Sequence, residues 1–567
     1  MAETNKNFWQ KNEKKILWLI IILAVILRFW NISTFDVMVD HALYSVRALG
    51  WFDYLGGGQT APVQWFGTIP AWALLSFHDC PPLVFFIQKI FFSILGDNTF
   101  ASRLPHALAG ILSVLLVYLS VKKIKSVQAA LWSAVVMAVS SYAVWASYAG
   151  YLEGVEVLFI VLSLYFFICY LADGKNKNLY WWAAAAGLAF LSKYTSVFLL
   201  PVGLLCLLGL NYRALKNSWQ KIFYSLLIFL GVISPVIFYN IMVFKYRGHF
   251  DASLSAMVGM HPQDYSAIAV RVVNANIIGN FSNLINCFPL GSSWPLVAIF
   301  ILALTYLLFK TIRGRSGKAE IFILANVLAA GLMFCFGEPA YRQVSIFIPF
   351  LVIVAAILFA DLSVYLSGKK YHLGGVFKLL ALAVLVAEFG YCVNTNILLK
   401  SWGSAPWFSS SQRLASNGWN ELEIYWRDNL LPPVMDRQKI RRLEEMPLSS
   451  RDFSGKNVIF YDDNVNWFSS MWYIEKYPLY YRVPLLPLSY LLNQPQALEQ
   501  FRSFGAKDFY YVSIVNPQAT DPVVSKNESL MKAIEQLNAK LVEDKIGFVE
   551  IKNAEGEAAF RIYKLNY

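Results

Sequence analysis

The run Val39-Asp40-His41-Ala42-Leu43-Tyr44 follows the first apolar segment of the chain, residues 16–30, within about ten residues. Charge close to a lipid bilayer is costly, so a carboxylate beside an imidazole at this place indicates a chemical use. If Asp40 begins a helix, Tyr44 and Arg47 follow one and two turns later on the same face. An acid so placed could take a proton from an acceptor hydroxyl. A solvated acid favoured by the helix dipole is the alternative.

Polar side chains of another kind stand further along the chain. His78 and Asp79 precede a Pro81-Pro82 turn, and Arg103 stands at the mouth of a later apolar segment. The planar fork of an arginine donates two parallel hydrogen bonds, which suits a lipid phosphate. Anchoring of the chain at the membrane interface is the alternative role for Arg103.

The composition sets the class of protein in which these residues work. The chain has 567 residues, of which 57% are hydrophobic and 15% charged, and long apolar segments recur from residue 16 to residue 393. This pattern predicts a polytopic α-helical membrane protein. The net charge of +12 could suggest nucleic acid. The basic residues lie instead in short clusters between apolar segments, which is a topology signal and argues against a nucleic-acid partner.

The apolar segments predict about eleven membrane crossings. They are residues 16–35, 101–120, 127–146, 154–172, 179–192, 194–210, 222–243, 294–310, 319–337, 343–365 and 375–393. Lysines before the first segment place the N-terminus in the cytoplasm, and the lack of a small-x-small cleavage site indicates an uncleaved anchor. An odd number of crossings places the C-terminal part outside the cell membrane.

The basic clusters at the predicted cytoplasmic side constrain the crossings further. They are Lys122-Lys123-x-Lys125, Lys175-x-Lys177, Arg213 to Lys221, Lys310 to Lys318 and Lys369-Lys370. Residues 179–210 have such clusters at both ends, so they must form a hairpin of two short helices whose outer tip carries Lys193. A snorkelling lysine is the alternative.

Two outer loops, residues 36–100 and 244–293, are long. Within the first, Pro82 to Leu95 is apolar but interrupted by Gln88 and Lys89, which predicts an amphipathic helix on the membrane surface.

The chain beyond residue 393 predicts a second domain, residues 394–567, after a membrane domain of residues 1–393. A Ser-, Trp- and Gly-rich linker at 401–417 precedes alternating elements, which suggest a small α/β domain. The expected strands are 457–462, 508–513 and 560–564, and the expected helices are 465–476 and 529–540. The aromatic run 467–481 could stack on sugar rings, but core packing is the expectation. None of the six cysteines lies in this domain, so it has no disulfide framework.

Five motifs occur in a consistent order along the chain: Asp40-His41-x-x-Tyr44, Pro81-Pro82-Leu83, Ser102-Arg103-Leu104-Pro105, Leu191-Ser192-Lys193 and Tyr341-Arg342. Together they resemble the dolichyl-phosphate-mannose–protein mannosyltransferase family in its bacterial form, which includes the aminoarabinose transferase of lipid A. The resemblance covers roughly residues 10–393. It implies a membrane glycosyltransferase of the GT-C fold whose donor is a hexose or pentose on a polyprenyl phosphate, with an acceptor that the sequence does not name.

The resemblance also implies roles for single residues. Asp40 takes the place of the catalytic base, although the family's Asp-Glu pair reads Asp40-His41 here. The candidates for binding the donor phosphate are Arg103, Lys193, Arg342 and His78. His78 is included because Cys80 stands where relatives often have His or Lys. The candidates for substrate contacts are His41, Tyr44, Asp79 and Glu153. Glu153 could equally be the structural partner of a membrane-embedded cation.

The implied mechanism is a single inverting displacement, in which Asp40 deprotonates the acceptor hydroxyl and cations stabilise the departing phosphate. No cofactor is required with certainty. A divalent metal ion on Asp40, His41, His78 and Asp79 is an alternative, and a hydrogen-bonded polar cluster around a sugar is the other.

Three further functions remain alternatives. They are a polyprenyl-linked glycan polymerase or ligase, a lipid or sugar transporter, and a membrane-anchored binding module. The sequence shows no internal repeat of the kind that transporters carry.

Overall fold

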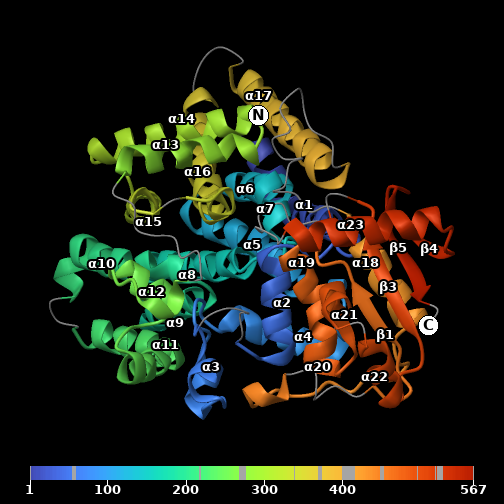
Figure 1. Cartoon of the computed structure of the whole chain (residues 1–567). Helices are drawn as coiled ribbons and strands as arrows, with labels where there is room; N and C mark the ends of the chain where they lie inside the picture. The colour runs from blue at the N-terminus through green and yellow to red at the C-terminus, as the bar shows by residue number, and fades with distance from the viewer. Residues whose placement is uncertain are drawn as a thin grey trace. The chain divides into compact units, whose positions relative to one another are not determined.

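A computed structural model describes most of the chain (Figure 1). The described residues are 2–53, 59–215, 219–266, 276–337, 339–367, 373–398, 416–446, 453–494, 496–516, 519 and 528–565. The predicted basic pair Lys369-Lys370 and most of the predicted linker, residues 401–415, lie outside these ranges.

Packing divides the chain into two units. The first, which we call the helical unit, comprises residues 1–32, 71–87 and 101–413, and the second, the sheet unit, comprises residues 33–70, 88–100 and 414–567. Much of the first predicted outer loop therefore packs with the C-terminal part of the chain. The predicted domain boundary between residues 393 and 394 stays a prediction.

The helical unit is built from helices, most of them long and apolar. They are α1 (Ala2–Phe29), α5 (Thr99–Ile124), α6 (Val127–Val139), α7 (Ser141–Ala146), α8 (Glu153–Asp173), α9 (Asn176–Ser192), α10 (Leu199–Leu215), α11 (Trp219–Arg247), α12 (Ala252–Met257), α13 (Ile277–Cys287), α14 (Trp294–Ile312), α15 (Lys318–Cys335), α16 (Ile348–Ser367) and α17 (Leu373–Cys392). Short helical turns η1 (Ala71–Leu75), η2 (Tyr194–Phe198), η3 (Gln263–Tyr265), η4 (Phe288–Leu290), η5 (Tyr341–Ile346) and η6 (Val393–Ile397) connect them. Helix α8 packs against α9, α9 against α11, and α16 against α6 and α14.

All eleven apolar segments expected from the sequence are largely helical. Within the described residues, seven helices are long and apolar enough to cross a membrane: α5, α8, α11, α14, α15, α16 and α17. Helix α6 and the stretch Tyr194–Leu210 are apolar but shorter. The protein is thus a multi-pass membrane protein, while the number of eleven crossings stays a prediction.

Two interruptions of helical structure place side chains inside the helical unit. Lys193 is extended, with φ −163° and ψ 139°, and separates α9 from η2 where the sequence predicted a hairpin tip. Ser140, with φ −57° and ψ 120°, separates α6 from α7. Such breaks expose backbone groups, which a membrane protein must satisfy internally.

The sheet unit combines a mixed sheet with helices. Its strands are β1 (Val458–Tyr461), β2 (Leu485–Pro487), β3 (Phe509–Ile514), β4 (Phe548–Lys552) and β5 (Ala558–Leu565). Its helices are α2 (Asp40–Gly50), α3 (Pro62–Phe66), α18 (Trp419–Asn429), α19 (Trp467–Ser470), α20 (Lys476–Tyr481), α21 (Leu488–Asn493), α22 (Ala497–Ser503) and α23 (Glu528–Glu543), with turns η7 (Leu443–Glu445) and η9 (Met471–Glu475). Helix α4 (Leu83–Leu95) contributes residues to both units.

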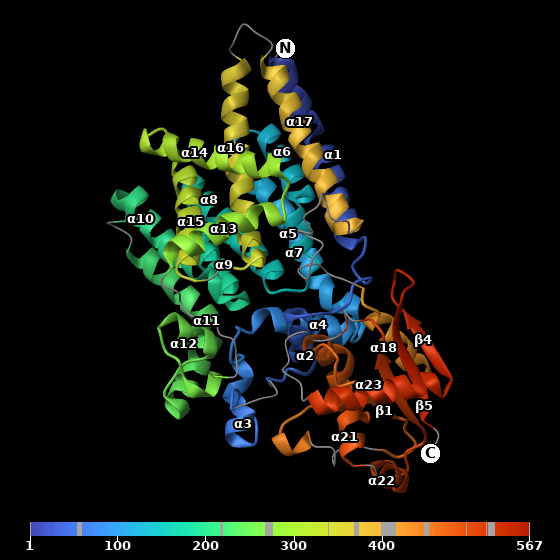
Figure 2. The same cartoon turned by 45° about the horizontal axis from the view of Figure 1, so that its top comes forward.

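The strands lie in the order β2-β1-β3-β5-β4. Strand β1 is parallel to β2 and β3, whereas β5 is antiparallel to β3 and β4. Side chains alternate between the faces: Val458, Phe460 and Tyr511 pack with Ile534 of α23 on one face. Figure 2 shows α23 lying across the strands. The ring of Phe560 meets Trp419 of α18 instead, with 4.9 Å between centroids.

The α/β class of the C-terminal part is therefore confirmed. The three expected strands and the helix at 529–540 are present, and the aromatic run 467–481 is largely core, since Trp472, Tyr473 and Tyr477 are buried. The sequence missed β2 and β4. The expected helix 465–476 begins at Trp467 and continues through η9 and α20 to Tyr481.

Candidate functional site

A buried carboxylate joins two cations in the helical unit. Glu153 begins α8, Lys193 follows α9 and Arg342 lies in η5. The Lys193 ammonium donates to Oε1 of Glu153, and Nε of Arg342 lies 3.4 Å from the same oxygen. The Glu153 side chain is only 2% exposed, whereas Lys193 and Arg342 are 16% and 19% exposed. The cluster therefore presents positive charge outward from a buried acid.

A second acid fixes the chain around Lys193. Glu156 is fully buried one turn after Glu153, and its Oε1 accepts hydrogen bonds from the hydroxyls of Thr195 and Ser196, each at 2.6 Å. The two hydroxyls follow the extended residue Lys193 by two and three positions, so these bonds hold the turn that carries its side chain. The sequence did not single out Glu156, although an acid inside an apolar segment is itself a signal of function or pairing.

Helix α5 approaches the start of α8 closely. A Cβ on Gly154 would lie 2.6 Å from the Ala146 carbonyl and 2.9 Å from Nδ1 of His106, so only glycine fits here. Arg103 lies one turn before His106, is fully buried, and donates from Nη1 to the Ile32 carbonyl at 3.0 Å. The structure thus gives Arg103 a backbone contact. Its role toward a phosphate stays a prediction.

Aromatic rings pack beside Arg342. The Arg342 guanidinium lies 5.3 Å from the centroid of the Tyr151 ring, within the range of a cation–π contact. Trp145 of α7 packs against both Tyr151 and Tyr341, with centroid distances of 5.6 Å and 5.2 Å. Helix α7 therefore helps to set the position of Arg342.

Two charged side chains stabilise the break that creates α7. Arg28 donates to the carbonyls of Ala138 and Met137 at the end of α6, at 3.1 Å and 3.2 Å. Glu388 of α17 accepts from the amide of Ser141 at the start of α7, at 2.8 Å. A cation at a helix C-terminus and an anion at a helix N-terminus both complement the helix dipole. Glu388 also accepts from the Ser293 amide, at the start of α14, at 2.8 Å.

Asp40 lies in the sheet unit as the first residue of α2. The hydroxyl of Tyr44 donates to its carboxylate at 3.5 Å, as the helical spacing predicted. Arg47 points instead toward Asp53, with 3.7 Å between Nη2 and Oδ1. The preceding residue, Val39, has φ +55°, a conformation that a β-branched side chain rarely adopts. Such strain is typical of functional positions. His41 is fully buried.

His78 and Asp79 lie in the helical unit beside α12. Their carbonyl oxygens accept from the Ala252 amide at 2.7 Å and the Ser253 hydroxyl at 2.5 Å. The nearby carboxylate of Asp251 is fully buried and accepts from the hydroxyl of Tyr194 at 2.7 Å. Burial raises the pKa of Asp251 to about 6, although hydrogen bonds oppose the rise.

Three of the nine predicted site residues, Glu153, Lys193 and Arg342, are therefore in direct contact. Within the described ranges, no group of three or more His, Cys, Asp or Glu side chains is arranged to hold a metal ion. Asp40 and His41 belong to the sheet unit and His78 and Asp79 to the helical unit, so a metal site shared by the four stays a prediction.

Residues 79–239 match the sequence profile of the family described as dolichyl-phosphate-mannose-protein mannosyltransferase. The matched stretch contains Arg103, Glu153 and Lys193. The family resemblance is confirmed. Its residue roles stay predictions, because the match is one of sequence and fold.

Curated relatives share only part of this chain. YycA of Bacillus subtilis (strain 168), whose name as a mannosyltransferase is itself provisional, is 35% identical over 158 residues, which are 27% of this chain and 23% of YycA. A protein of Aquifex aeolicus (strain VF5) is 30% identical over 222 residues, 38% of this chain and 42% of that protein. The chain thus spans well under half the length of the curated relatives it matches.

Solved structures extend the similarity to the whole fold. ArnT from Cupriavidus metallidurans in the apo state is 13% identical with a TM-score of 0.53, over 96% of this chain and 97% of ArnT. The oligosaccharyltransferase of Archaeoglobus fulgidus is 13% identical with a TM-score of 0.50, over 88% of this chain and 69% of that one. The expected GT-C fold with a C-terminal sheet domain is confirmed.

Proposed function

We propose that this protein is a membrane glycosyltransferase that moves a sugar from a polyprenyl-phosphate donor to an acceptor hydroxyl of a lipid, glycan or protein. The observation that carries the proposal is the pair of cations, Lys193 and Arg342, held on the buried Glu153 in a fold similar to GT-C enzymes. A lipid phosphate is the anion that such a site would meet in a membrane.

The donor class has support from a neighbour in fold. ArnT from Cupriavidus metallidurans has been solved bound to undecaprenyl phosphate, and that structure has a TM-score of 0.51 to this chain at 13% identity. The polyprenyl-phosphate donor of this protein is our proposal by that likeness. The outward exposure of both cations beside a 2% exposed Glu153 supports it, because a departing phosphate gains negative charge that cations stabilise.

The proposed reaction is a single displacement with inversion. The Asp40 carboxylate takes the proton from the acceptor hydroxyl as its oxygen attacks the anomeric carbon. The bond from that carbon to the phosphate oxygen breaks, and the polyprenyl phosphate leaves with the electron pair. The Tyr44 hydroxyl, at 3.5 Å, orients the carboxylate.

The remaining predicted residues keep proposed roles around this reaction. We assign Arg103 and His78 as further phosphate ligands and His41 and Asp79 as substrate contacts. Glu153 has the role of a buried partner that positions both cations, since its carboxylate contacts them directly. The N-terminus is proposed to be cytoplasmic and the sheet unit extracytoplasmic.

Sugar transfer in membrane vesicles tests the proposal. Vesicles are given a panel of radiolabelled polyprenyl-monophosphate hexoses and pentoses, with polyprenyl-diphosphate glycans as a second arm. Wild type is compared with Asp40→Asn at matched expression, and Asp428→Asn, an exposed acid on α18, serves as the control.

We expect wild type and the control to consume a monophosphate donor and Asp40→Asn to lose at least about a hundredfold in rate, the scale of general-base catalysis. Equal activity of Asp40→Asn would remove Asp40 as the base. Consumption of the diphosphate donors alone would make the protein a polymerase or ligase. Label that crosses the bilayer unchanged would favour a transporter.

A further inference from the structure

A strip of cations crosses the surface of the sheet unit. Arg437, Lys439 and Arg441 occur at every second position and are all exposed, while Ile440 between them is buried. In an extended chain this spacing places side chains on the same side. The glycosyltransferase proposal gives these residues no role.

The backbone holds the strip in place at both ends. The Gln438 amide donates to the Tyr480 carbonyl at 2.7 Å, and Nη1 of Arg437 donates to the Leu49 carbonyl at the end of α2, at 3.3 Å. At the other end of the strip, the Ile69 amide donates to the Arg441 carbonyl at 2.9 Å. A strip fixed in this way meets a ligand with little loss of conformational entropy.

Lys89 of α4 completes the cluster. Its ammonium lies 5.3 Å from the centroid of the Trp51 ring. Partial burial lowers the pKa of Lys89, and repulsion by Lys439, Arg437 and Arg441 lowers it further. Among the described residues, the charged groups that shift the pKa of Lys89 are all cations. Four cations at one place repel one another, and an anion would relieve that repulsion.

The acids near the strip are outnumbered: residues 436–445 carry three acids, Asp436, Glu444 and Glu445, against four cations, and Lys89 adds a fifth cation. Glu444 pairs with Arg442, the next residue along, at 3.1 Å. The Glu445 carboxylate accepts from the backbone amide of Arg441 at 2.8 Å. The side chains of the strip therefore face solvent as a positive surface.

The helix that carries Lys89 also exposes an apolar stripe. Phe86, Ile90 and Ile94 recur every four residues along α4, and their exposed fractions are 52%, 42% and 73%. Lys89 follows Phe86 by three residues and so borders this stripe. A helix with an exposed apolar stripe next to cations is typical of a membrane interface, where the stripe enters the acyl boundary and the cations meet headgroups.

We propose that Lys89, Arg437, Lys439 and Arg441 form a binding site for the phosphate headgroup of an anionic phospholipid, beside the membrane-seeking stripe of α4. The site is made by residues of the sheet unit, whereas the cluster at Glu153 is made by residues of the helical unit. It takes its ligand from the surrounding bilayer, so the proposal does not depend on the transferase reaction.

Native mass spectrometry of the full-length protein in detergent tests this site. Phosphatidylglycerol, phosphatidylcholine and soluble glycerol phosphate are titrated separately onto wild type and onto Arg437→Gln/Lys439→Gln/Arg441→Gln. Lys540→Gln/Lys545→Gln/Lys552→Gln removes the same charge from exposed positions elsewhere in the sheet unit and is the matched control.

Wild type and the control should retain phosphatidylglycerol in preference to phosphatidylcholine. The strip variant should bind phosphatidylglycerol about tenfold more weakly than wild type. Added salt should lower the phosphatidylglycerol affinity of wild type toward that of the variant. Equal phosphatidylglycerol binding by the strip variant and the control would overturn the proposal. Glycerol phosphate competing as strongly as the lipid would show a soluble-anion site instead. Thermal unfolding of each variant checks that the fold is intact.

Discussion

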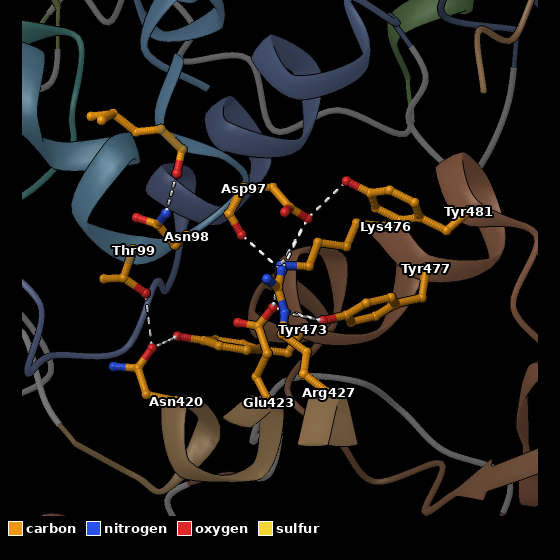
Figure 3. A network of polar contacts seen from close by, with 11 residues as sticks. Asp97, Asn98, Thr99, Asn420, Glu423, Arg427, Tyr473, Lys476, Tyr477 and Tyr481 are labelled. Atoms are coloured by element: carbon orange, nitrogen blue, oxygen red, sulfur yellow. Dashed lines mark hydrogen bonds and ion pairs between the residues drawn. The ribbon is translucent and has the colours of Figure 1, made fainter. Parts of the chain in front are cut away.

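Two ion clusters, one in each unit, use the same kinds of side chain in different proportions. In the helical unit, Lys193 and Arg342 share the single carboxylate of Glu153. In the sheet unit, two acids, Asp97 and Glu423, meet two cations, Arg427 and Lys476 (Figure 3). The second set is balanced, whereas the first has a surplus of positive charge in its direct ion pairs.

The balanced cluster contains a cation that is completely buried, whereas both cations of the Glu153 cluster are partly exposed. Lys476 is 0% exposed, donates to Glu423 at 2.5 Å and lies 3.8 Å from the centroid of the Trp472 ring. The hydroxyls of Tyr477 and Tyr481 donate to Glu423 at 2.8 Å and Asp97 at 2.9 Å. Burial would raise the pKa of Asp97, but Lys476 and Arg427 hold it below its ordinary value. Its charges satisfy one another, so this cluster has the features of structural support.

Removing a cation should therefore do different things in the two clusters. Lys476→Met leaves Glu423 and Asp97 buried beside a single cation, and a broken buried ion pair costs about 3–5 kcal/mol of unfolding free energy. Chemical denaturation of the detergent-solubilised protein, followed by near-ultraviolet circular dichroism, measures this loss. Lys540→Met, which changes an exposed residue of α23, is the control. A loss below about 1 kcal/mol would contradict the structural assignment.

Lys193→Gln should weaken transfer more than it weakens the fold. Glu153 keeps Arg342, so we expect a small loss of stability, while the lost charge should lower transfer about a hundredfold, as for other groups that stabilise developing charge. Transfer rate and unfolding are measured on the same preparation. Lys193→Arg, which keeps the charge, should recover part of the rate. If Lys193→Gln lowered the free energy of unfolding as much as Lys476→Met, the Glu153 cluster would also be structural support.

The pH dependence of stability separates two acids of the sheet unit. Burial raises the pKa of Asp36 to about 7, although the backbone amides of Asn417 and Asn420 oppose the rise. An unfolded aspartate has a pKa of about 3.9. Asp36 therefore contributes most to the free energy of unfolding below that pH, and this contribution falls as the pH rises to about 7. Asp97 has a lowered pKa in the folded protein, so it stabilises the fold above its unfolded pKa. This stabilisation is lost as the pH falls through the pKa of Asp97 in the folded protein.

Asp36→Asn should remove the decline between about pH 4 and pH 7, a change on the order of 3 kcal/mol. Unfolding free energies of wild type and variant across that range measure it. Parallel curves for the two proteins would show that Asp36 titrates as it does in the unfolded chain.

The smallest effect is expected at the strained residue before Asp40. Val39→Gly should relieve the strain of φ +55° and raise stability by about 1 kcal/mol. If the strain holds the carboxylate in position, transfer should fall although the fold becomes more stable. A variant that is both more stable and fully active would remove any functional meaning from this conformation.

Local patterns predicted the parts of the molecule that local forces determine. Basic clusters on both sides of residues 179–210 required a turn, and Lys193 is the residue at which the helix breaks. The spacing of Asp40 and Tyr44 predicted their contact within α2. The apolar segments likewise predicted their helices.

Contacts between distant segments could not be read in the same way. Arg28 and Glu388 meet the two sides of the break at Ser140 from opposite ends of the helical unit's sequence, and nothing local pairs them. Strand β2 has three residues and ends in a proline, too short for an alternating pattern. Four of the five residues of β4 are exposed, the first three of them in a row, and only Ile551 is buried, so the strand shows no alternating pattern.

The position of Glu153 has a consequence for biosynthesis. Glu153 precedes Lys193 by 40 residues, whereas Arg342 is translated much later, after α10 to α15. During insertion the nascent chain therefore carries this acid into the membrane with Lys193 as its first available counter-ion. Lys193, which follows α9, can then pair with Glu153 as α8 and α9 insert into the bilayer. Arg342 joins the cluster only when most of the helical unit has been synthesised.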